Sequence, residues 1–331
     1  MPKGETETVR LSAAKAVAFG TEALQRIGLE LDEARTIAAQ LVDSALSGYP
    51  AFGLARILTI SEHPRICEPR KPLAITHKTP ASARIDCGNH VGMYAISCVT
   101  DIAIAKAGEQ GIAVIGATNT YLSGRNGYYL ERIARAGFVG LHLVSGQPKV
   151  APAGGRTSAL GTNPIAFGLP RDPDPLVFDI GTGAVNHGDL KLAARLGTEL
   201  PDGAAIDARG EPTNDPLAAL AGAILPFGGH KGYGLSIAIQ ALGLLGGAAL
   251  DPEKPQDFGY LFVVFKPGLL LPADDFERNL EELIARIKET PRQPGIEEIR
   301  IPSERAQAER ARRLETGIEV DRVVYDKISE L

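Results

Sequence analysis

A glycine-rich stretch followed by an apolar run constrains the fold of this chain more than any other feature. Residues 225–234 read Leu-Pro-Phe-Gly-Gly-His-Lys-Gly-Tyr-Gly, and the apolar residues that follow predict a helix that is buried on all sides. Glycine lacks a Cβ, so the backbone can adopt a positive φ and approach a ligand closely. A loop of this kind at a helix N-terminus presents free N–H groups and partial positive charge. We therefore expect an anion site here, with His230 and Lys231 as further donors; a tight turn before a core helix would explain only one or two of the glycines.

Bulk composition excludes several classes of partner. The 331 residues suffice for two domains, or for one large domain with a helical annex. A net charge of −5 without a basic cluster argues against nucleic acid and anionic membranes as partners. Cys67, Cys87 and Cys98 form no C-x-x-C pair, so we expect neither a disulfide framework nor a bound metal. The polar N-terminus and the absence of a long apolar run predict a cytoplasmic protein.

The first sixty or so residues predict a helical unit. Ser12 is placed to cap a helix that Gly28 ends, and Asp32 is placed to cap a second helix that Gly48 ends. A third helix is expected from Leu54 onward, after a turn that contains proline and glycine.

From Pro72 onward the pattern changes to alternating strands and helices, which predicts an α/β fold. Near the C-terminus, Ser303 is placed to cap a helix that Gly317 ends, and Asp321 is placed to cap the last helix. The predicted strands are 82–86, 111–117, 139–144, 164–169, 176–180, 261–265 and a short one at 298–301, and the predicted helices are 93–107, 128–136 and 274–288.

Glycine and hydroxyl residues follow the ends of several predicted strands. Examples are the stretches 151–156, 161–164 and 181–183, and the sequence Asn-His-Gly-Asp at 186–189. Ligand crevices in α/β proteins form at such strand ends. We therefore expect a small-molecule site built from these loops.

Several of these stretches together resemble the type-2 malate/L-lactate dehydrogenases, most closely the Δ1-piperideine-2-carboxylate/Δ1-pyrroline-2-carboxylate reductases. The resemblance rests on Gly-Thr-Asn-Pro-Ile-Ala-Phe at 161–167, Phe-Asp at 178–179, His-Gly-Asp at 187–189, residues 225–232, and Arg-Ile-Pro at 300–302. It covers most of the chain, and it is the combination of these motifs in this order that is specific.

The resemblance implies a nicotinamide-dependent reductase. Its nucleotide-binding domain would contain a mixed sheet without being a Rossmann fold, in agreement with the absence of the G-x-G-x-x-G and P-loop patterns. A helical domain would be built from both chain ends, residues 1–70 and 303–331, and an α/β domain of residues 71–302 would bind cofactor and substrate. The resemblance also implies a homodimer with active sites near the interface.

The family's functional residues carry over onto this chain position by position. Substrate contacts are implied for Arg56, Thr162, His187 and Gly188, and a catalytic pair for Asp189 with His187. Arg300 and Arg305 would be ligands for a 2′-phosphate, which favours NADP as cofactor, with NAD as the alternative. The implied cofactor contacts are Leu122, Ser123, Gly124, Arg125, Asn126, Asp179, Ile180, Gly181, His230, Lys231, Arg300, Ile301, Pro302, Ser303, Glu304 and Arg305.

The chain departs from the family at two histidines. The family has Ser-His-Gly after the second helix, with the histidine as proton donor, whereas residues 51–53 here are Ala-Phe-Gly. A further histidine in the loop before Gly127 is replaced by Tyr-Leu-Ser at 121–123. Asp189 therefore lacks the partners that it would orient.

This departure bears on the substrate. Reduction of a ketone leaves an alkoxide that needs a proton from a positioned acid. A cyclic imine can enter already protonated, and Asp189 would then stabilise the iminium charge. We therefore predict reduction of a small cyclic imino acid to the cyclic amino acid by hydride transfer to C2. The alternatives are a 2-hydroxy acid dehydrogenase with a substituted proton donor and a non-catalytic nucleotide-binding paralogue.

Each of these residues also has a purely structural interpretation. Arg56 on a helix is often a solvated surface charge, and His187 alone is often a loop residue with its hydrogen bonds satisfied. Asp189 is placed to cap a helix that begins at Leu190. Tyr49 and Tyr121 are candidate replacement acids or packing groups.

Overall fold

The computed structural model describes residues 7–249 and 258–331. Within them the main element is a seven-stranded sheet in the order β2-β3-β4-β11-β5-β6-β7. In this sheet β3 and β4 run parallel, and the other neighbouring strands are antiparallel. The fold is therefore α/β with a mixed sheet, as predicted. The strands are β2 (Ala74–Lys78), β3 (Ser82–Asp86), β4 (Ile112–Thr118), β5 (Val139–Ser145), β6 (Ile165–Leu169), β7 (Leu176–Ile180) and β11 (Gly259–Phe265).

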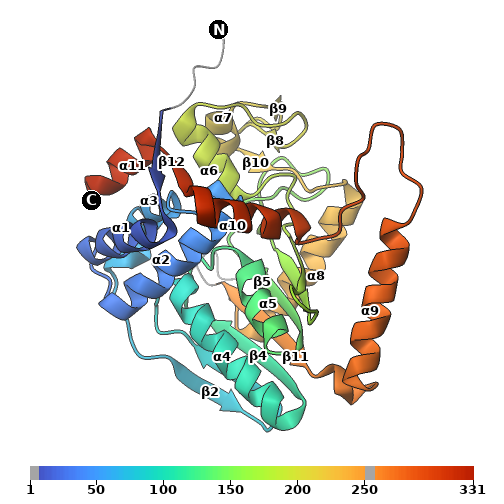
Figure 1. Ribbon diagram of the computed structural model, residues 1–331. Coiled ribbons are helices and arrows are strands. Elements are labelled where there is room, and N and C mark those ends of the chain that lie inside the picture. The colour runs from blue at the N-terminus through green and yellow to red at the C-terminus, as the bar shows by residue number, and fades with distance from the viewer. Residues whose placement is uncertain (1–6, 250–257) are drawn as a thin grey trace.

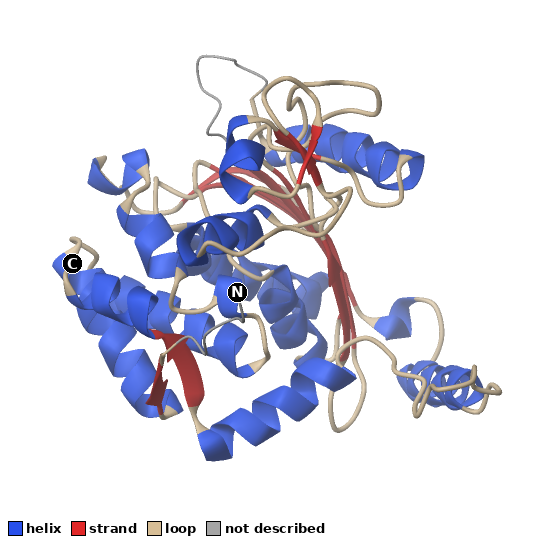
Figure 2. Ribbon diagram, turned by 90° about the horizontal axis from the view of Figure 1, so that it is seen from above, coloured by secondary structure: helices blue, strands red, loops and turns tan. Residues whose placement is uncertain are grey.

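Helices cover both faces of this sheet (Figure 1). α4 (Gly92–Gln110) and α5 (Asn126–Arg135) pack on one face, and α8 (His230–Gly246) packs on the other. Phe262 lies in the core shared with α4 and α5, whereas its neighbour Leu261 faces α8, because successive side chains of a strand point to opposite faces. Figure 2 shows the sheet nearly edge-on, with most of the helices gathered on one side.

The two ends of the described chain meet in space. β1 (Thr8–Leu11) pairs antiparallel with β12 (Ile318–Asp321). Residues of the first helices and of the last helix share one apolar core. The helix caps predicted at Ser12 and Asp321 are confirmed, since each side chain accepts a hydrogen bond from the first turn of its helix. The helices in this region are α1 (Ala13–Arg26), α2 (Leu31–Leu46), α3 (Arg56–Ser61) and α11 (Arg322–Ser329).

The remaining elements surround one end of the main sheet. A small antiparallel sheet has the order β10-β8-β9, and α10 crosses the front of the molecule in Figure 1. These elements are α6 (His187–Leu196), β8 (Ala205–Ile206), β9 (Pro212–Thr213), α7 (Pro216–Ala221), β10 (Ala223–Ile224), α9 (Ala273–Lys288) and α10 (Glu304–Thr316), with short 3₁₀ turns at Pro50–Phe52, Pro64–Cys67 and Pro267–Leu269.

Several predicted boundaries are wrong. Asp32 lies inside α2, which begins at Leu31. The helix predicted to end at Gly108 continues to Gln110, because Gly111 is the residue with the left-handed backbone (φ 80°) that ends it. Residues 298–301 form no strand. Ser303 flanks α10 with a φ of 81°, but its hydroxyl hydrogen-bonds the backbone of Val177 instead of capping the helix.

The prediction that the apolar helix is buried on all sides is also wrong for this chain. On α8 the buried residues are Gly232, Ser236, Ile239, Gly243 and Gly246. Small residues on this face let the helix approach the sheet closely: a Cβ at position 246 would collide with the backbone of β11. Ile239 packs against the sheet, but several other large side chains point away from it, among them Ile237 at 45% and Leu245 at 68% exposed.

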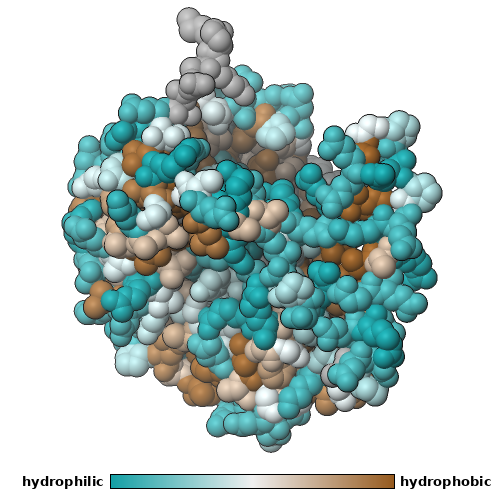
Figure 3. Space-filling model, in the orientation of Figure 1, coloured by the Kyte–Doolittle hydropathy of each residue, from teal (hydrophilic) through white to brown (hydrophobic). Residues whose placement is uncertain are grey.

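The face of the molecule seen in Figure 3 is mostly hydrophilic, with hydrophobic side chains in small separate groups. No helix in the described part of the chain is both long and apolar enough to cross a membrane. Among the same residues, no three His, Cys, Asp or Glu side chains are arranged to hold a metal ion.

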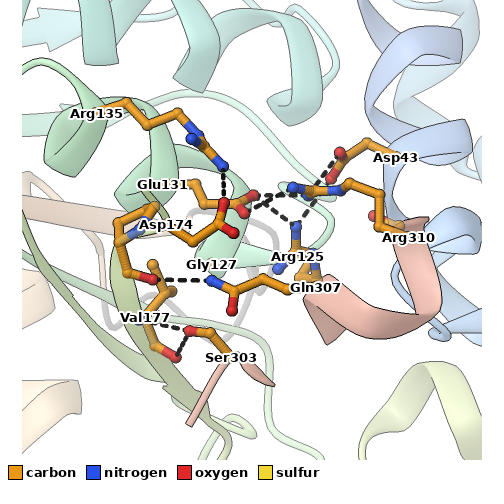
Figure 4. A network of polar contacts seen from close by, with 12 residues as sticks. Asp43, Arg125, Gly127, Glu131, Arg135, Asp174, Val177, Ser303, Gln307 and Arg310 are labelled. Atoms are coloured by element: carbon orange, nitrogen blue, oxygen red, sulfur yellow. Dashed lines mark hydrogen bonds and ion pairs between the residues drawn. The ribbon is translucent and has the colours of Figure 1, made fainter. Parts of the chain in front are cut away.

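Polar contacts hold α10 to the body of the protein. None of its residues is buried. Arg310 makes two hydrogen bonds of 2.8 Å to Glu131 on α5 and an ion pair of 2.7 Å to Asp43 on α2 (Figure 4). Burial raises the pKa of Glu131, but the Arg310 and Arg125 guanidinium groups outweigh this and lower it below its usual value. Charge-assisted hydrogen bonds thus replace apolar burial at this contact.

We expect Arg310→Met to lower the free energy of unfolding by about 2 kcal/mol, because it leaves the carboxylates of Asp43 and Glu131 without their main partner. Urea denaturation measures this. Arg312→Met is the matched control on the same helix, since Arg312 pairs with the neighbouring Glu309 at the surface. Equal losses in the two variants would contradict the assignment.

Candidate active site

A cavity of about 850 Å³ opens at the end of the main sheet. The loop before α5, the end of β7 and the first turn of α6 line it, together with the segment from the end of α2 to α3 and the start of α10. Parts of the chain that are far apart in sequence therefore meet at one site, as the pattern of loops at strand ends predicted. The sequence-predicted residues on its wall are Arg56, Leu122, Ser123, Gly124, Arg125, Asn126, Thr162, Asp179, Ile180, Gly181, His187, Gly188, Asp189 and Ser303.

Arg56 is the first residue of α3 and its guanidinium group lies in this cavity. It is 8% exposed, so the interpretation as a solvated surface charge is wrong. Its Cζ lies 5.1 Å from the ring centroid of Phe52. Within the described residues its Nε has no hydrogen-bond partner. Burial lowers the pKa of Arg56 to about 10, with a partly opposing effect of Asp189, so the group remains a cation at neutral pH. A buried guanidinium without a carboxylate hydrogen-bonded to it is suited to bind the carboxylate of a ligand.

The first turn of α6 presents His187, Gly188 and Asp189 to the same cavity. The helix begins at His187 after the N-cap Asn186, so the interpretation of Asp189 as the cap of a helix beginning at Leu190 is wrong. Asp189 is exposed at the cavity rim and accepts a 3.1 Å hydrogen bond from Asn186.

His187 is a neutral side chain surrounded by cations. Burial, together with the charges of Lys149, Lys191 and Arg56, lowers its pKa to about 3. Its Nδ1 is buried and has no hydrogen-bond partner within the described part of the chain. An imidazole in this state can accept or donate a hydrogen bond to a ligand, but it is not a reservoir of protons at neutral pH.

Three basic residues of the cavity wall were not singled out from the sequence: His63, Lys149 and Lys191. Burial lowers the pKa of both lysines. Lys191 stands four residues after His187 on α6, a helical spacing that the sequence contained. Lys149 lies in the loop that follows β5, just before the glycine-containing stretch 151–156. This position was the available sequence signal for Lys149.

His63 stacks on Tyr121, with ring centroids 4.2 Å apart, and its Nδ1 accepts a hydrogen bond from the backbone N–H of Arg65. Burial lowers the pKa of His63 to about 4, and the resulting neutral ring carries its proton on Nε2. Tyr121 is fully buried and lies behind His63 rather than on the cavity wall, which favours its interpretation as a packing group.

The loop of residues 122–126 lines the cavity with unusual backbone geometry. Leu122 has a φ of 59° and Gly124 a φ of 73°. At the start of α5, Asp179 accepts a 2.8 Å hydrogen bond from the N–H of Gly127, so a protein carboxylate already occupies this helix N-terminus. Arg125 is paired with Asp43 at 2.9 Å. The buried Oδ1 of Asn126 has no partner among the described residues, which leaves one acceptor for a ligand.

The structure does not bring all the predicted cofactor residues to the cavity. His230 and Lys231 are exposed at the start of α8, although the expected positive φ occurs at Gly228 (54°) and Gly229 (60°). Arg300 and Pro302 are exposed, and Ile301 is buried against α9. Further along, Glu304 pairs with Lys288, and Arg305 lies over the ring of Tyr49, which itself lines the cavity.

Comparison with known proteins identifies the family. Residues 11–329 match the Malate/L-lactate dehydrogenase family. The chain belongs to this family. It is 32% identical to an L-sulfolactate dehydrogenase of Methanocaldococcus jannaschii, over 94% of this chain and 92% of that protein. It is 33% identical to a Δ1-pyrroline-2-carboxylate reductase of Ancylobacter novellus, over 98% of each chain.

Solved structures agree with this assignment. The fold of this family member matches the crystal structure of a Δ1-piperideine-2-carboxylate reductase from Pseudomonas syringae with a TM-score of 0.82 and 29% identity, covering 98% of this chain and 99% of that chain. The relatives are dehydrogenases and reductases, so the chain is an oxidoreductase.

The substitution Gly188→Ala tests whether Arg56 binds the ligand. A Cβ at this position would lie 2.7 Å from Nη2 of Arg56, so in Gly188→Ala the guanidinium has to move. Because Nη2 is the end of a flexible side chain, we expect the melting temperature to change little. Affinity for oxalate, a small carboxylate probe, should fall roughly tenfold, or about 1.4 kcal/mol, in isothermal titration calorimetry. Gly268→Ala, which has open space around its Cβ, is the control. Unchanged oxalate affinity in Gly188→Ala would refute this role of Arg56.

Proposed function

We propose that this protein is an NAD(P)H-dependent reductase of a small 2-imino or 2-oxo carboxylate, with a cyclic imino acid as the first candidate. One observation carries the proposal: the buried Arg56 guanidinium faces the cavity, and no carboxylate of residues 7–249 or 258–331 is hydrogen-bonded to it. A charge desolvated in this way is stabilised when a ligand carboxylate pairs with it. The dehydrogenase and reductase relatives imply a nicotinamide cofactor.

The cavity wall fits such a cofactor in size and chemistry. Its volume of about 850 Å³ lies at the upper end of the usual range for ligand sites, roughly 300–1,000 Å³. The unpartnered Oδ1 of Asn126 is suited to accept a hydrogen bond from an amide or a ribose hydroxyl. Residues 122–126 and 179–181 and Ser303 would hold the cofactor, which supplies the hydride.

The protein's own residues would orient the substrate for that transfer. Arg56 holds the carboxylate, and Gly188 leaves room for the guanidinium. Thr162 and the neutral His187 lie on the same wall, where they can hydrogen-bond the group bonded to C2. Such positioning of the reacting carbon accounts for a large part of the rate in hydride transfer.

Phe52 and Leu122 favour a cyclic imine. Both line the cavity at the two places where the resembling family has histidines, and neither can donate a proton. A substrate that enters protonated needs no donor there, and Asp189 at the rim supplies a negative charge for the iminium. Δ1-Piperideine-2-carboxylate and Δ1-pyrroline-2-carboxylate are the substrates that we propose first.

A second candidate is a 2-oxo acid that carries two anionic groups. Lys149 and Lys191 join Arg56 on the cavity wall, and all three act together on His187, whose pKa they lower. Three cations around one ligand favour a dianion over a zwitterion. The relative from Methanocaldococcus jannaschii is named for such a dianion.

We further propose NADP as the cofactor, a homodimer as the assembly and the cytoplasm as the location. NADP is favoured over NAD because Arg305, exposed and next to Tyr49, has no acidic partner within the described residues. The homodimer is supported by the exposed apolar side chains of α8, and a cytoplasmic location remains a prediction from the sequence. The non-Rossmann character of the nucleotide-binding domain and the boundaries of the helical domain are likewise predictions from the sequence.

The decisive experiment follows NADPH and NADH absorbance at 340 nm with a panel of cyclic imines, pyruvate and oxaloacetate. We expect turnover of a cyclic imine. Arg56→Met should raise its KM roughly 10- to 100-fold, because a charge-assisted hydrogen bond contributes about 1.5–3 kcal/mol. Arg209→Met, at a site 85% exposed, is the matched control. Cofactor binding without oxidation by any substrate would favour the non-catalytic paralogue, and faster turnover of a keto acid would favour the second candidate.

A further inference from the structure

We propose that Lys149 is the proton donor when this cavity reduces a 2-oxo acid. The inference rests on the proposed function and concerns the same cavity. It assigns a role to a residue that the sequence did not single out and that lies at neither of the two positions where the resembling family has its histidines.

The backbone of Lys149 is held firmly in place. Its N–H donates to the carbonyl of Leu160 at 2.7 Å, and its own carbonyl accepts from the N–H of Ile224 at 2.9 Å. The next residue, Val150, is fully buried and bridges to both of these neighbours. The side chain is thus directed from a fixed point, as a catalytic group requires.

The surroundings of the ammonium group set Lys149 apart from the other cavity cations. Its side chain has no hydrogen bond or ion pair with any described residue. Burial is the cause that lowers its pKa. The titratable groups coupled to it, His187 and Lys191, both lie on α6 and neither is negative. The backbone neighbours Leu160 and Ile224 are apolar.

Lys191 differs because a carboxylate opposes its desolvation. Glu62 raises the pKa of Lys191, and Glu62 is also bound at 2.6 Å by Arg195. The charge of Asp189 acts on Arg56. Among the described residues, Lys149 is therefore the cavity ammonium group on which no carboxylate acts to stabilise the proton, which makes that proton the easiest to give up.

Other side chains of the wall are less suited to the task. His63 and His187 have pKa values of about 4 and about 3, so neither carries an ionisable imidazolium proton at neutral pH. Arg56 has a pKa of about 10 and is committed to the carboxylate in the proposed function. Tyr49 lies between the Arg125 and Arg305 guanidinium groups.

Reduction of a 2-oxo acid to the 2-hydroxy acid requires one hydride and one proton. Hydride from the reduced nicotinamide forms a C–H bond at C2, and the π electrons of the carbonyl move to its oxygen. The Lys149 ammonium gives that oxygen a proton, so the products are the 2-hydroxy acid, the oxidised nicotinamide and a neutral Lys149 amine. Solvent entering the cavity reprotonates the amine. A protonated imine needs no such donor, because hydride addition gives the neutral amine directly.

The test compares Lys149→Arg with Lys191→Arg. Arginine keeps the positive charge but does not give up its proton at accessible pH. In Lys149→Arg we expect kcat for oxaloacetate to fall at least 100-fold, the lower end of a general-acid effect of about 10² to 10⁴. Its kcat for Δ1-piperideine-2-carboxylate should change less than threefold, and oxalate affinity without cofactor, measured by calorimetry, should be retained. Lys191→Arg should lose far less kcat for oxaloacetate than Lys149→Arg, and Lys327→Arg, at an exposed position on α11 outside the cavity, should leave both activities within threefold.

The pH profile gives a second readout. Because the protonated amine is the active form and burial lowers its pKa, kcat for oxaloacetate should decrease as pH rises through a value below the ordinary 10.5 of lysine. Lys149→Arg should lose this alkaline limb for oxaloacetate and should leave the pH profile of the imine reaction unchanged. A melting temperature equal to that of the unmodified protein shows that the variant is folded, and Lys149→Met serves if arginine does not fit.

The outcomes separate the two proposals. Undiminished oxaloacetate reduction in Lys149→Arg, an equal loss in Lys191→Arg, or a parallel loss of imine reduction would each overturn the role of Lys149. An unmodified protein that reduces the imine but no 2-oxo acid would also overturn it, while the proposed function stands. An unmodified protein that oxidises neither NADPH nor NADH with any substrate would overturn the proposed function itself.

Discussion

The site depends on one desolvated charge. Arg56 is buried, stacked against Phe52 and fitted closely against Gly188, yet within the described part of the chain no carboxylate hydrogen-bonds to its guanidinium group. Removing a guanidinium from water costs free energy that the folded protein recovers only in part through Asp189 at the cavity rim. The rest is recovered when a ligand supplies a carboxylate. A small anion therefore completes the cavity, and the neighbouring residues determine which anion binds.

The residues around Arg56 divide into two groups by their electrostatics. His63 and His187 are neutral because they are buried among cations, and they can serve as hydrogen-bond partners of fixed position. Lys149 and Lys191 keep the cavity positive and differ in whether a carboxylate stands nearby. A ketone requires a proton that the substrate does not bring with it, whereas a protonated imine does not. The cavity can therefore reduce an imine without a proton donor but needs one to reduce a ketone.

The glycine-rich loop and its helix have a different place in the molecule from the one that the sequence predicts. Gly228 and Gly229 adopt the expected positive φ, but His230 and Lys231 face outward and leave the cavity to other elements. The glycines of α8 allow the helix to lie directly on the sheet, while several of its larger apolar side chains, such as Ile237 and Leu245, remain on the outside. A purely apolar run contains no signal for which side faces the core, so burial on all sides was the natural but wrong inference.

The sequence by itself determined the family, the α/β class with a mixed sheet, most helix and strand positions, and the residues of the chain that form the wall at Arg56, Thr162, 122–126, 179–181 and 187–189. These follow from local signals: caps, turn residues, apolar periodicity and motifs of fixed spacing. It missed the pairing of β1 with β12 and the contribution of His63, Lys149 and Lys191, because each depends on contacts between segments far apart in the chain. Burial keeps His187 unprotonated and lowers the pKa of Lys149. This burial is likewise a property of the packed molecule. Only the tertiary structure sets how much water surrounds a charge and which other charges lie beside it, and those two quantities decide what each side chain can do.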